Sequence, residues 1–292
     1  MSKPLVSVII PTYNRSKLLK RAIDSVLQQT YSHLECLVVD DASTDNTNEV
    51  IAEYEDERII YIRHNENKHV SVARNTGIKH AGGKYLAFLD DDDEWLPSKL
   101  EKQVQVFESV DSKVGLIYCW MDFYDGKKLI QQRHPKLRGD IFKETLSSQP
   151  IGNASTLLVK TEIAEEIGGF DTNLPRGNDG DFIRRICQNY EVDLVPEVLV
   201  RYHENHGNKR ITRNDTIGLK NAIISQKTKL KKFRDELDLN PDSKAKVLAS
   251  IGYFYSQRSD WKNGFKYYKK AFLTCPFSKS LYKYLYRSIR KT

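Results

Sequence analysis

Short apolar segments alternate with amphipathic segments over the first two hundred residues, and this alternation limits the fold more than any other feature. Residues 5–10 (LVSVII) and 34–40 (LECLVVD) are apolar and read as buried strands, whereas residues 16–29 carry apolar side chains at helical spacing. Further strands are expected at 58–62 and 85–89, with helical segments between them. Strands that alternate with helices form a parallel sheet covered on both faces. The sequence therefore predicts an α/β fold with a mostly parallel, doubly wound sheet.

The pattern becomes less regular after Pro97. Pro97 suits the first position of a helix, because that position needs no backbone N–H group, and a strand follows at 114–120. A hairpin turn is expected at 124–130, a strand at 154–160 and an amphipathic helix at 181–190. We therefore expect an α/β region followed by an α+β extension.

The net charge of +7 hides two parts of opposite sign. Residues 1–212 hold 27 Lys and Arg against 33 Asp and Glu, a balance of −6, whereas residues 213–292 hold 19 against 6, a balance of +13. Such an abrupt change in composition indicates a domain boundary. We expect one domain at 1–212 and a basic helical region at 213–292.

The basic region contains the pattern of one helical hairpin, at about residues 245–278. Small and bulky residues recur there at the offsets of a tetratricopeptide repeat, in which the small residues let two helices touch. The matching residues are Leu248, Ile251, Gly252, Tyr255, Gly264, Tyr268, Ala271 and Pro276. A single unit of this kind is not stable alone, so we expect it to pack against flanking helices or the first domain.

Membrane-spanning and disulfide-rich classes are not expected. No apolar run is as long as a bilayer span, and the short apolar stretch near the N-terminus lacks the cleavage site of a signal peptide. Cys36, Cys119, Cys187 and Cys275 are scattered, with no CxxC pair and no His at ligand spacing, and read as buried free thiols. A cytoplasmic location is therefore expected.

Four consecutive carboxylates, Asp90 to Asp93, follow the apolar strand at 85–89. Adjacent carboxylates raise one another's pKa unless a cation joins them. A divalent ion such as Mn²⁺ or Mg²⁺ takes oxygen ligands and commonly binds substrate phosphates as well. A solvated helix N-terminus before Pro97 would account for Asp93 and Glu94 but not for Asp90, which still belongs to the strand. The run therefore predicts a metal or metal–diphosphate site.

Polar residues also follow the other predicted strands, at 11–15 (PTYNR), 40–43 (DDAS) and 66–77 (ENKHVSVARNTG). Ligands of a doubly wound sheet bind beyond the carboxyl ends of its strands, so these segments and the acidic run should share one crevice. Asp40 and Asp41 alone would also suit a helix cap and turn, or the phosphoacceptor of a receiver-like domain. The length of the chain and the absence of a suitably placed Lys after a late strand argue against the receiver.

Five segments carry a more specific pattern when they are taken together. In chain order they are VSVIIPTYNR, LVVDDASTDNT, ARNTGIKHAGGKYLAFLDDDDEWLP, IGGFD and NDGDFIRRI. Their order and spacing resemble the family-2 inverting glycosyltransferases with the A-type nucleotide-sugar-binding fold, over about residues 5–208. The resemblance implies a Rossmann-like, mostly parallel sheet with an α+β extension on the acceptor side, and a C-terminal helical appendage lies outside it.

The resemblance implies a donor site for a nucleotide diphosphate sugar. Thr12, Tyr13 and Arg15 would border the nucleoside, with the Tyr13 ring stacked on the base. Asp41 would accept from the imide of uracil with Arg74 nearby, which favours a UDP-sugar.

The family's Asp-x-Asp motif maps to Asp90 and Asp92. Asp92 would hold Mn²⁺ or Mg²⁺ on the diphosphate, and Asp90 or Asp91 would face the ribose or the donor sugar.

The family's catalytic base lies in an acidic pair before a helix, commonly Glu-Asp-x-Asp. Here Asp179 takes the position of the base and Asp181 a supporting position, while Asn178 replaces the Glu and Gly180 the usual aromatic residue. Simple N-capping of the following helix is compatible with a base at Asp179.

A His in the segment RYHENHGN can approach the diphosphate or the metal in related enzymes. His203 and His206 are both candidates, and the register between them stays open.

The resemblance implies transfer of a sugar to a glycan or lipid-linked acceptor hydroxyl, in the synthesis of surface polysaccharide or glycoconjugate. A non-catalytic nucleotide-sugar-binding scaffold and a nucleotidyltransferase are the alternatives; the second would need a glycine-rich triphosphate loop, which residues 11–17 (PTYNRSK) lack. The basic C-terminal helices predict peripheral contact with the inner face of the plasma membrane. No nucleic-acid recognition motif accompanies their charge.

Overall fold

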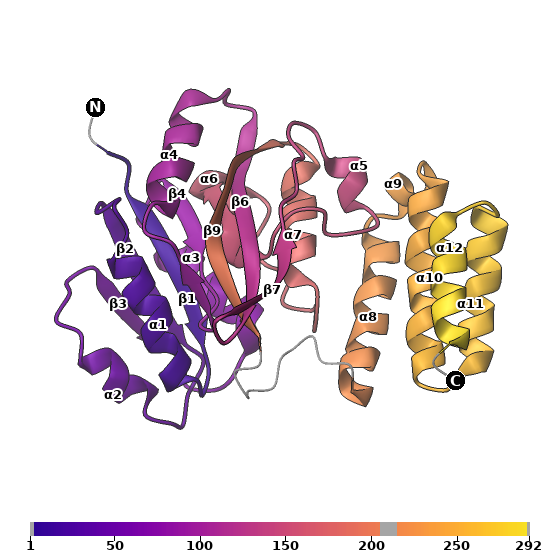
Figure 1. The fold of residues 1–292 in the computed structure, drawn as a ribbon, viewed down its shortest axis with the longest axis horizontal. Helices are drawn as coiled ribbons and strands as arrows, with labels where there is room; N and C mark the ends of the chain where they lie inside the picture. Colours follow the sequence, from indigo (N-terminus) through magenta and orange to yellow (C-terminus); the bar gives the residue numbers. More distant parts are fainter. Residues whose placement is uncertain (1–2, 205–214, 291–292) are drawn as a thin grey trace. The chain divides into compact units, whose positions relative to one another are not determined.

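The computed structural model describes residues 3–204 and 215–290, and the chain divides into two compact units (Figure 1). Unit 1 contains Met1–Ile141, Pro150–Thr172 and Arg185–Gly207, and unit 2 contains Phe142–Gln149, Asn173–Arg184 and Asn208–Thr292. Two short segments from the first 212 residues thus group with the C-terminal helices. The domain boundary at 212/213 stays a prediction.

Unit 1 is built on a mixed sheet with the strand order β3-β2-β1-β4-β8-β6-β9-β5, and β7 pairs with β6. Its strands are β1 (Val6–Thr12), β2 (Leu34–Asp40), β3 (Ile59–Arg63), β4 (Tyr85–Phe88), β5 (Asp93–Trp95), β6 (Val114–Asp125), β7 (Lys128–Arg133), β8 (Leu157–Lys160) and β9 (Glu191–Glu204). The run β3-β2-β1-β4 is parallel, and so is the pair β6–β9. β8, β5 and β7 are antiparallel to their neighbours. The expected α/β class and mostly parallel sheet are confirmed.

Helices cover both faces of this sheet (Figure 1). Those of unit 1 are α1 (Ser16–Leu27), α2 (Thr47–Ala52), α3 (His69–His80), α4 (Lys99–Ser109), α6 (Thr161–Glu166) and the 3-10 turn η1 (Ala154–Thr156). Val8 and Ile10 of β1 are fully buried in the cluster that contains the apolar side of α1. Ile9, which points to the opposite face, lies against Gly77 of α3. This alternation along one strand buries both faces of the sheet.

The chain between the acidic run and α4 differs from the expectation. Asp93 to Trp95 form the short strand β5, which pairs with β9, and Leu96 N continues that pairing with a bond to Leu199 O. A helix N-terminus at Asp93 is therefore wrong. Pro97 is not the first helical residue either, because α4 begins at Lys99.

Unit 2 is helical in its described residues. It contains α5 (Phe142–Thr145), the part of α7 (Asn178–Cys187) up to Arg184, α8 (Thr216–Lys232), α9 (Arg234–Asp238), α10 (Pro241–Gln257), α11 (Trp261–Thr274) and α12 (Lys279–Ile289). α10 and α11 touch where Gly252 meets Gly264, since a Cβ on Gly252 would lie 3.1 Å from Gly264 O. Tyr268 and Ala271 are buried in the same seam, and Leu281 of α12 packs against it. The tetratricopeptide-like spacing falls on this pair of helices.

The cysteines are free thiols, and Cys36, Cys119 and Cys187 are buried. Burial raises the pKa of Cys36 and of Cys119 to about 12, so neither forms a thiolate at neutral pH. Within residues 3–204 and 215–290, no helix has the length and apolar character needed to cross a bilayer.

Candidate active site

Sharp turns after β1 and β2 bring the first two polar segments together. Asn14 and Ala42 have φ angles of 53° and 67°, in the left-handed region, so the chain reverses soon after each strand. Asn14 N donates to Ser43 Oγ over 2.9 Å, and Asn14 Oδ1 accepts from Thr44 N over 2.7 Å. These bonds hold the two loops together at the edge of the sheet where the sequence predicts a crevice.

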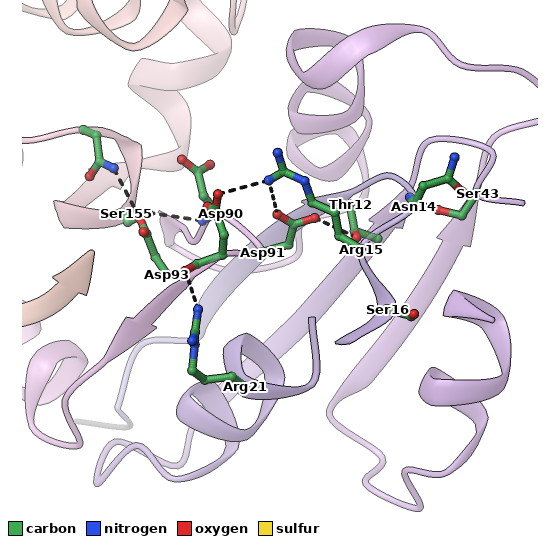
Figure 2. Close-up of polar contacts among 12 residues, drawn as sticks. Thr12, Asn14, Arg15, Ser16, Arg21, Ser43, Asp90, Asp91, Asp93 and Ser155 are labelled. Carbon is green, nitrogen blue, oxygen red and sulfur yellow. Dashed lines mark hydrogen bonds and ion pairs between the residues drawn. The ribbon is translucent and has the colours of Figure 1, made fainter. Parts of the chain in front are cut away.

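Arg15 neutralises part of the acidic run (Figure 2). Its Nη1 lies 2.9 Å from Asp91 Oδ1 and 3.1 Å from Asp92 Oδ2. Thr12 Oγ1 donates to the other oxygen of Asp91 over 2.8 Å. Burial lowers the pKa of Arg15, but Asp91 and Asp92 outweigh burial and raise it above its usual value. The segment after β1 is thereby bonded to the segment after β4.

Arg74 of α3 binds the first carboxylate of the run. Its Nη2 lies 2.5 Å from Asp90 Oδ1, and its guanidinium lies 4.9 Å from the centre of the Phe170 ring. The Arg74 residue is only 3% exposed, so the guanidinium is fixed in place. The expected place of Arg74 near Asp41 and the uracil stays a prediction.

Burial leaves two of the four carboxylates poorly solvated. Burial raises the pKa of Asp91 to about 7; Arg15 opposes this rise and Asp92 adds to it. The pKa of Asp93 is raised well above its usual value by burial and then by the neighbouring charges of Asp92 and Asp90. Negative charge is therefore costly here unless a cation is added.

Asp90, Asp92 and Asp93 can share one cation. Each offers a carboxylate oxygen, and these oxygens all lie within 4.8 Å of one another. Asp93 Oδ2 accepts from Ser155 Oγ over 2.5 Å and from Asn153 Nδ2 over 3.3 Å. Asp93 Oδ1 is buried and has no hydrogen-bond partner among the described residues. An all-oxygen donor set with an unsatisfied buried carboxylate oxygen fits a hard divalent ion such as Mn²⁺ or Mg²⁺.

Asp41 is already bonded by the start of α3. Its Oδ1 lies 2.8 Å from His64 Nδ1 and accepts from Lys68 N over 2.9 Å, while its Oδ2 accepts from His69 N over 2.7 Å. A carboxylate has about four acceptor positions, so Asp41 retains the capacity for one further bond. Its role toward uracil stays a prediction.

Several residues of the site had no signal in the sequence. Arg21 of α1 donates from Nη2 to Asp92 O over 2.5 Å (Figure 2). Ser155 and Asn153 reach Asp93 from more than fifty residues away along the chain. For Asp93 the sequence leaves the alternative of a helix N-terminus open, whereas the structure places Asp93 on β5, with a carboxylate oxygen in the carboxylate cluster.

Tyr13 and the two candidate histidines are the remaining residues predicted for the donor site. Tyr13 follows β1 and is 43% exposed, so its side chain is accessible to solvent. His203 lies on β9, with Nε2 2.9 Å from Glu94 Oε2. The hydrogen bond from His203 lowers the pKa of Glu94, although burial opposes it, and Arg201 lowers the pKa further. His206 lies outside the described residues.

Asp179 and Asp181 lie in the first turn of α7, within unit 2. Asp179 is half-buried, whereas Asp181 is buried and forms a salt bridge of 2.9 Å with Lys232. Asn178 Nδ2 donates to Leu174 O over 3.2 Å. The carboxylate cluster belongs to unit 1, so its pairing with Asp179 in one reaction stays a prediction.

Comparison with known proteins places the chain among the glycosyltransferases, as the five sequence segments predict. The family model described as Glycosyl transferase family 2 matches residues 7–168. An uncharacterized glycosyltransferase of Methanocaldococcus jannaschii is 35% identical over 214 residues, which cover 69% of this chain and 71% of the relative. WfgD of Escherichia coli, a UDP-Glc:alpha-D-GlcNAc-diphosphoundecaprenol beta-1,3-glucosyltransferase, is 44% identical over 106 residues, which cover 36% of this chain and 42% of that protein.

Solved structures confirm the A-type glycosyltransferase fold. TarS 1-349 of S. aureus in complex with UDP-GlcNAc has a TM-score of 0.65 at 15% identity, covering 90% of both chains. The mannosyltransferase PcManGT from Pyrobaculum calidifontis, in complex with GDP-Man and Mn²⁺, has a TM-score of 0.57 at 19% identity, covering 100% of this chain and 77% of that one. At these identities the likeness concerns the fold alone.

Proposed function

Because the chain belongs to glycosyl transferase family 2, we propose that it is an inverting enzyme that transfers a sugar from a UDP-sugar to a hydroxyl of a glycan or lipid-linked acceptor. The observation that carries the proposal is the carboxylate cluster after β4, tied to the loop after β1 through Arg15. The UDP-GlcNAc complex of TarS and the lipid-linked acceptor in the name of WfgD support the substrate classes. Surface polysaccharide or glycoconjugate synthesis is the corresponding process.

On the donor side, residues of the loops after β1, β2 and β4 would each contact the nucleotide. Tyr13 offers an exposed ring for the base, and Asp41 keeps one acceptor position for the uracil imide. Thr12 and Arg15 are both bonded to Asp91, and the three residues would border the nucleoside and ribose.

Asp92, assigned from the sequence as the metal ligand, would hold a divalent cation together with Asp90 and Asp93. When bound, this ion would supply Lewis-acid stabilisation of the charge that develops on the departing diphosphate. Arg15 and Arg74 would add fixed positive charge beside the cluster, and His203 would keep Glu94, the middle residue of β5, oriented.

On the acceptor side, Asp179 would act as the general base. Its carboxylate takes the proton of the acceptor hydroxyl while that oxygen attacks the anomeric carbon of the donor sugar. The bond from that carbon to the diphosphate oxygen breaks in the same step, so UDP leaves and the configuration inverts. Asp181, bonded to Lys232, would support the position of the first turn of α7.

Asp179→Asn tests the base. General-base catalysis contributes about 10²–10⁴-fold, so transfer should fall by that factor while affinity for UDP stays unchanged. Transfer is followed by release of UDP, and UDP affinity by calorimetry. Asp125→Asn, an exposed carboxylate at the end of β6, is the control and should change neither quantity. Equal losses of transfer and UDP affinity in the Asp179 variant would count against the assignment.

Asp92→Ala tests the cation site. In the presence of Mn²⁺ the affinity for UDP should fall by about tenfold or more, because a charged ligand of the cation is removed. In EDTA the variant should no longer bind UDP more weakly than wild type, because neither protein then holds the ion. An affinity for UDP that does not depend on Mn²⁺ in the wild type would contradict a metal-dependent enzyme.

The same measurements separate the alternatives. A non-catalytic scaffold would bind UDP without releasing it from any UDP-sugar, and a nucleotidyltransferase would release pyrophosphate from UTP. Hydrolysis of a panel of nucleotide sugars with Mn²⁺ would identify the donor.

We also retain the proposal that the basic C-terminal helices contact an anionic membrane from the cytoplasmic side, with no role for nucleic acid. Lys279, Lys283 and Arg287 are exposed at successive turns of α12. Exposed aromatic side chains lie beside them, including Phe277, which is 91% exposed. Basic residues next to exposed aromatic ones are typical of helices that lie on a membrane surface.

A further inference from the structure

Unit 2 contains a pocket that the proposed reaction leaves unexplained. Its volume is about 170 Å³. A cavity of roughly 10–15 Å³ already holds one water molecule, so this pocket can hold a larger ligand. The charged side chains of its wall are Arg176, Arg184, Lys229 and Asp181. Three cations against one carboxylate give the wall a formal charge of +2.

Arg184 is built into this wall. It is 2% exposed, its Nε donates to Thr145 O over 2.8 Å, and its guanidinium lies 5.1 Å from the centre of the Phe233 ring. These contacts fix the plane of the guanidinium. A guanidinium is always charged, and its planar arrangement of N–H groups matches the oxygens of a phosphate.

Lys229 of α8 adds a second cation to the same wall. Burial lowers its pKa well below the usual value, the charges of Arg184 and Lys246 lower it further, and Asp181 only partly opposes them. Asp181 is itself paired with Lys232, and Lys229 forms no salt bridge in the part of the chain that the structure describes. An anion in the pocket would therefore stabilise the charged form of Lys229.

Neutral donors complete the wall. Ser225 lines the pocket, and its buried Oγ has no hydrogen-bond partner in residues 3–204 and 215–290. Gly177 and Gly180, also in the wall, carry no side chain. Gly177 precedes α7 and Gly180 lies in its first turn, where the backbone N–H groups form the positive end of the helix. Hydroxyl and amide donors around two Arg and one Lys can surround a tetrahedral anion, whereas a planar carboxylate would use only part of them.

We propose that this pocket binds a phosphate or diphosphate group, and that the group belongs to the acceptor. The acceptor part rests on the proposed function, because Asp179, the proposed base, lies in the chain between the wall residues Gly177 and Gly180. The enzyme would then extend a sugar that is carried on a phosphate or diphosphate, rather than a neutral free glycan. The donor sugar and its metal site are not involved in this recognition.

The first test measures the anion directly. Sodium pyrophosphate is titrated into the full-length protein by calorimetry in EDTA, so that the carboxylate cluster holds no metal and repels the anion. Lys229→Met and Arg176→Met should each lower the affinity by about tenfold or more, since each removes a charged hydrogen-bond donor. Lys220→Met, which removes an exposed charge from the same helix α8, is the matched control and should bind like wild type.

Two outcomes of this titration would overturn the site. One is no binding of pyrophosphate, or equal binding by wild type and both pocket variants. The other is displacement of pyrophosphate by acetate at equal concentration, which would identify a carboxylate site instead.

The second test separates the pocket from the proposed reaction. Alkyl glycosides and the matching alkyl glycosyl diphosphates, for a small panel of sugars, are offered as acceptors to wild type, Lys229→Met and Lys220→Met. In Lys229→Met the KM for the diphosphate acceptor should rise by about tenfold or more, while the KM for the UDP-sugar and transfer to the neutral glycoside stay unchanged.

An equal effect of Lys229→Met on both acceptors would overturn the acceptor assignment and leave the proposed function intact. Pyrophosphate binding in the pocket without transfer to either acceptor, and without hydrolysis of any UDP-sugar, would overturn the proposed function and the acceptor assignment but leave the anion site.

Discussion

Lys99 carries an ammonium group into the interior of unit 1. It is fully buried, its Nζ donates to Gln103 Oε1 over 2.7 Å, and the same atom lies 3.8 Å from the centre of the Trp95 ring. Burial lowers the pKa of Lys99 to about 8; the only other influence is Cys119, which raises it. No carboxylate in residues 3–204 and 215–290 compensates the charge, so the protonated form costs stability.

The pH dependence of this cost can be measured. Below pH 8 both folded and unfolded Lys99 are protonated, and the cost is complete. Between about pH 8 and about pH 10.5 only the unfolded state keeps the proton, so the free energy of unfolding should rise with pH, by about 3 kcal/mol in total. Above that range both states are neutral and the rise ends.

Urea unfolding of wild type and Lys99→Met at pH 7, 8.5 and 10 isolates this effect, because other titrations cancel between the two proteins. The stability of wild type relative to the variant should increase across the series. A constant difference, or one that shrinks with pH, would show that Lys99 keeps an ordinary pKa in the folded protein.

Some residues of the site could be predicted from the sequence and others could not. The run of four adjacent carboxylates after an apolar strand predicts a cation site, and within it the resemblance to the family points to Asp90 and Asp92. Asp93 could not be assigned, because its position depends on the pairing of β5 with β9, which begins about a hundred residues later. Arg21 and Ser155 carry no local pattern, and only the folded sheet brings them to the acidic run.

At the scale of an element, Gly83 sets the approach of β4 to β1. A Cβ on Gly83 would lie 2.7 Å from Ser7 N and 2.8 Å from Leu5 O, both backbone atoms of the neighbouring segment. Gly83→Ala should therefore lower the free energy of unfolding by about 1–3 kcal/mol, because the strands must separate. Thermal or urea unfolding measures the change.

Gly82 provides the matched control. A Cβ there would be 3.6 Å from its nearest neighbour, the side chain of Glu35, which is ordinary contact. Gly82→Ala should change the free energy of unfolding by no more than about 0.5 kcal/mol. Similar losses for both variants would mean that the effect does not come from the close approach of Gly83 to the neighbouring strand.

The regular elements of unit 1 could be predicted and the irregular ones could not. β1 and β2 are apolar runs that are buried almost throughout, and in α1 the apolar residues recur at helical spacing and most of them are buried. β5 has three residues, two of them acidic, so no periodicity can reveal it, and its existence depends on the edge offered by β9. The chain stays extended through Leu96 for the same reason, which delays the start of α4.

At the scale of the whole molecule, the charge of the C-terminal helices predicts binding to anionic vesicles. Wild type should sediment with vesicles that contain phosphatidylserine and not with pure phosphatidylcholine. Each basic residue near such a surface contributes about 1 kcal/mol, so Lys283→Glu with Arg287→Glu should weaken binding by more than about tenfold. Both side chains are exposed on α12, so the double variant should fold.

Lys127→Glu with Lys128→Glu makes the same change of charge at the exposed tip of the hairpin that β6 and β7 form, and this double variant should keep binding. Point variants are preferable to removal of α12, because Leu281 is buried and Ser288 Oγ lies 2.5 Å from Tyr268 Oη. Binding that is equal in both double variants would show that the surface of α12 is not the contact.

Unit 2 is assembled from three separated stretches of the chain, and this limits how the protein can be recombined with its relatives. Thr145 and Phe233 hold Arg184 from two sides, and Lys232 holds Asp181. A chimera that receives a foreign region 213–292 alone would lose Phe233 and Lys232, and with them the support of the helix that begins beside Asp179. Residues 142–149 and 173–184 must therefore be grafted together with the C-terminal helices. Any selectivity that these helices confer would pass to a chimera only when all three stretches are transferred.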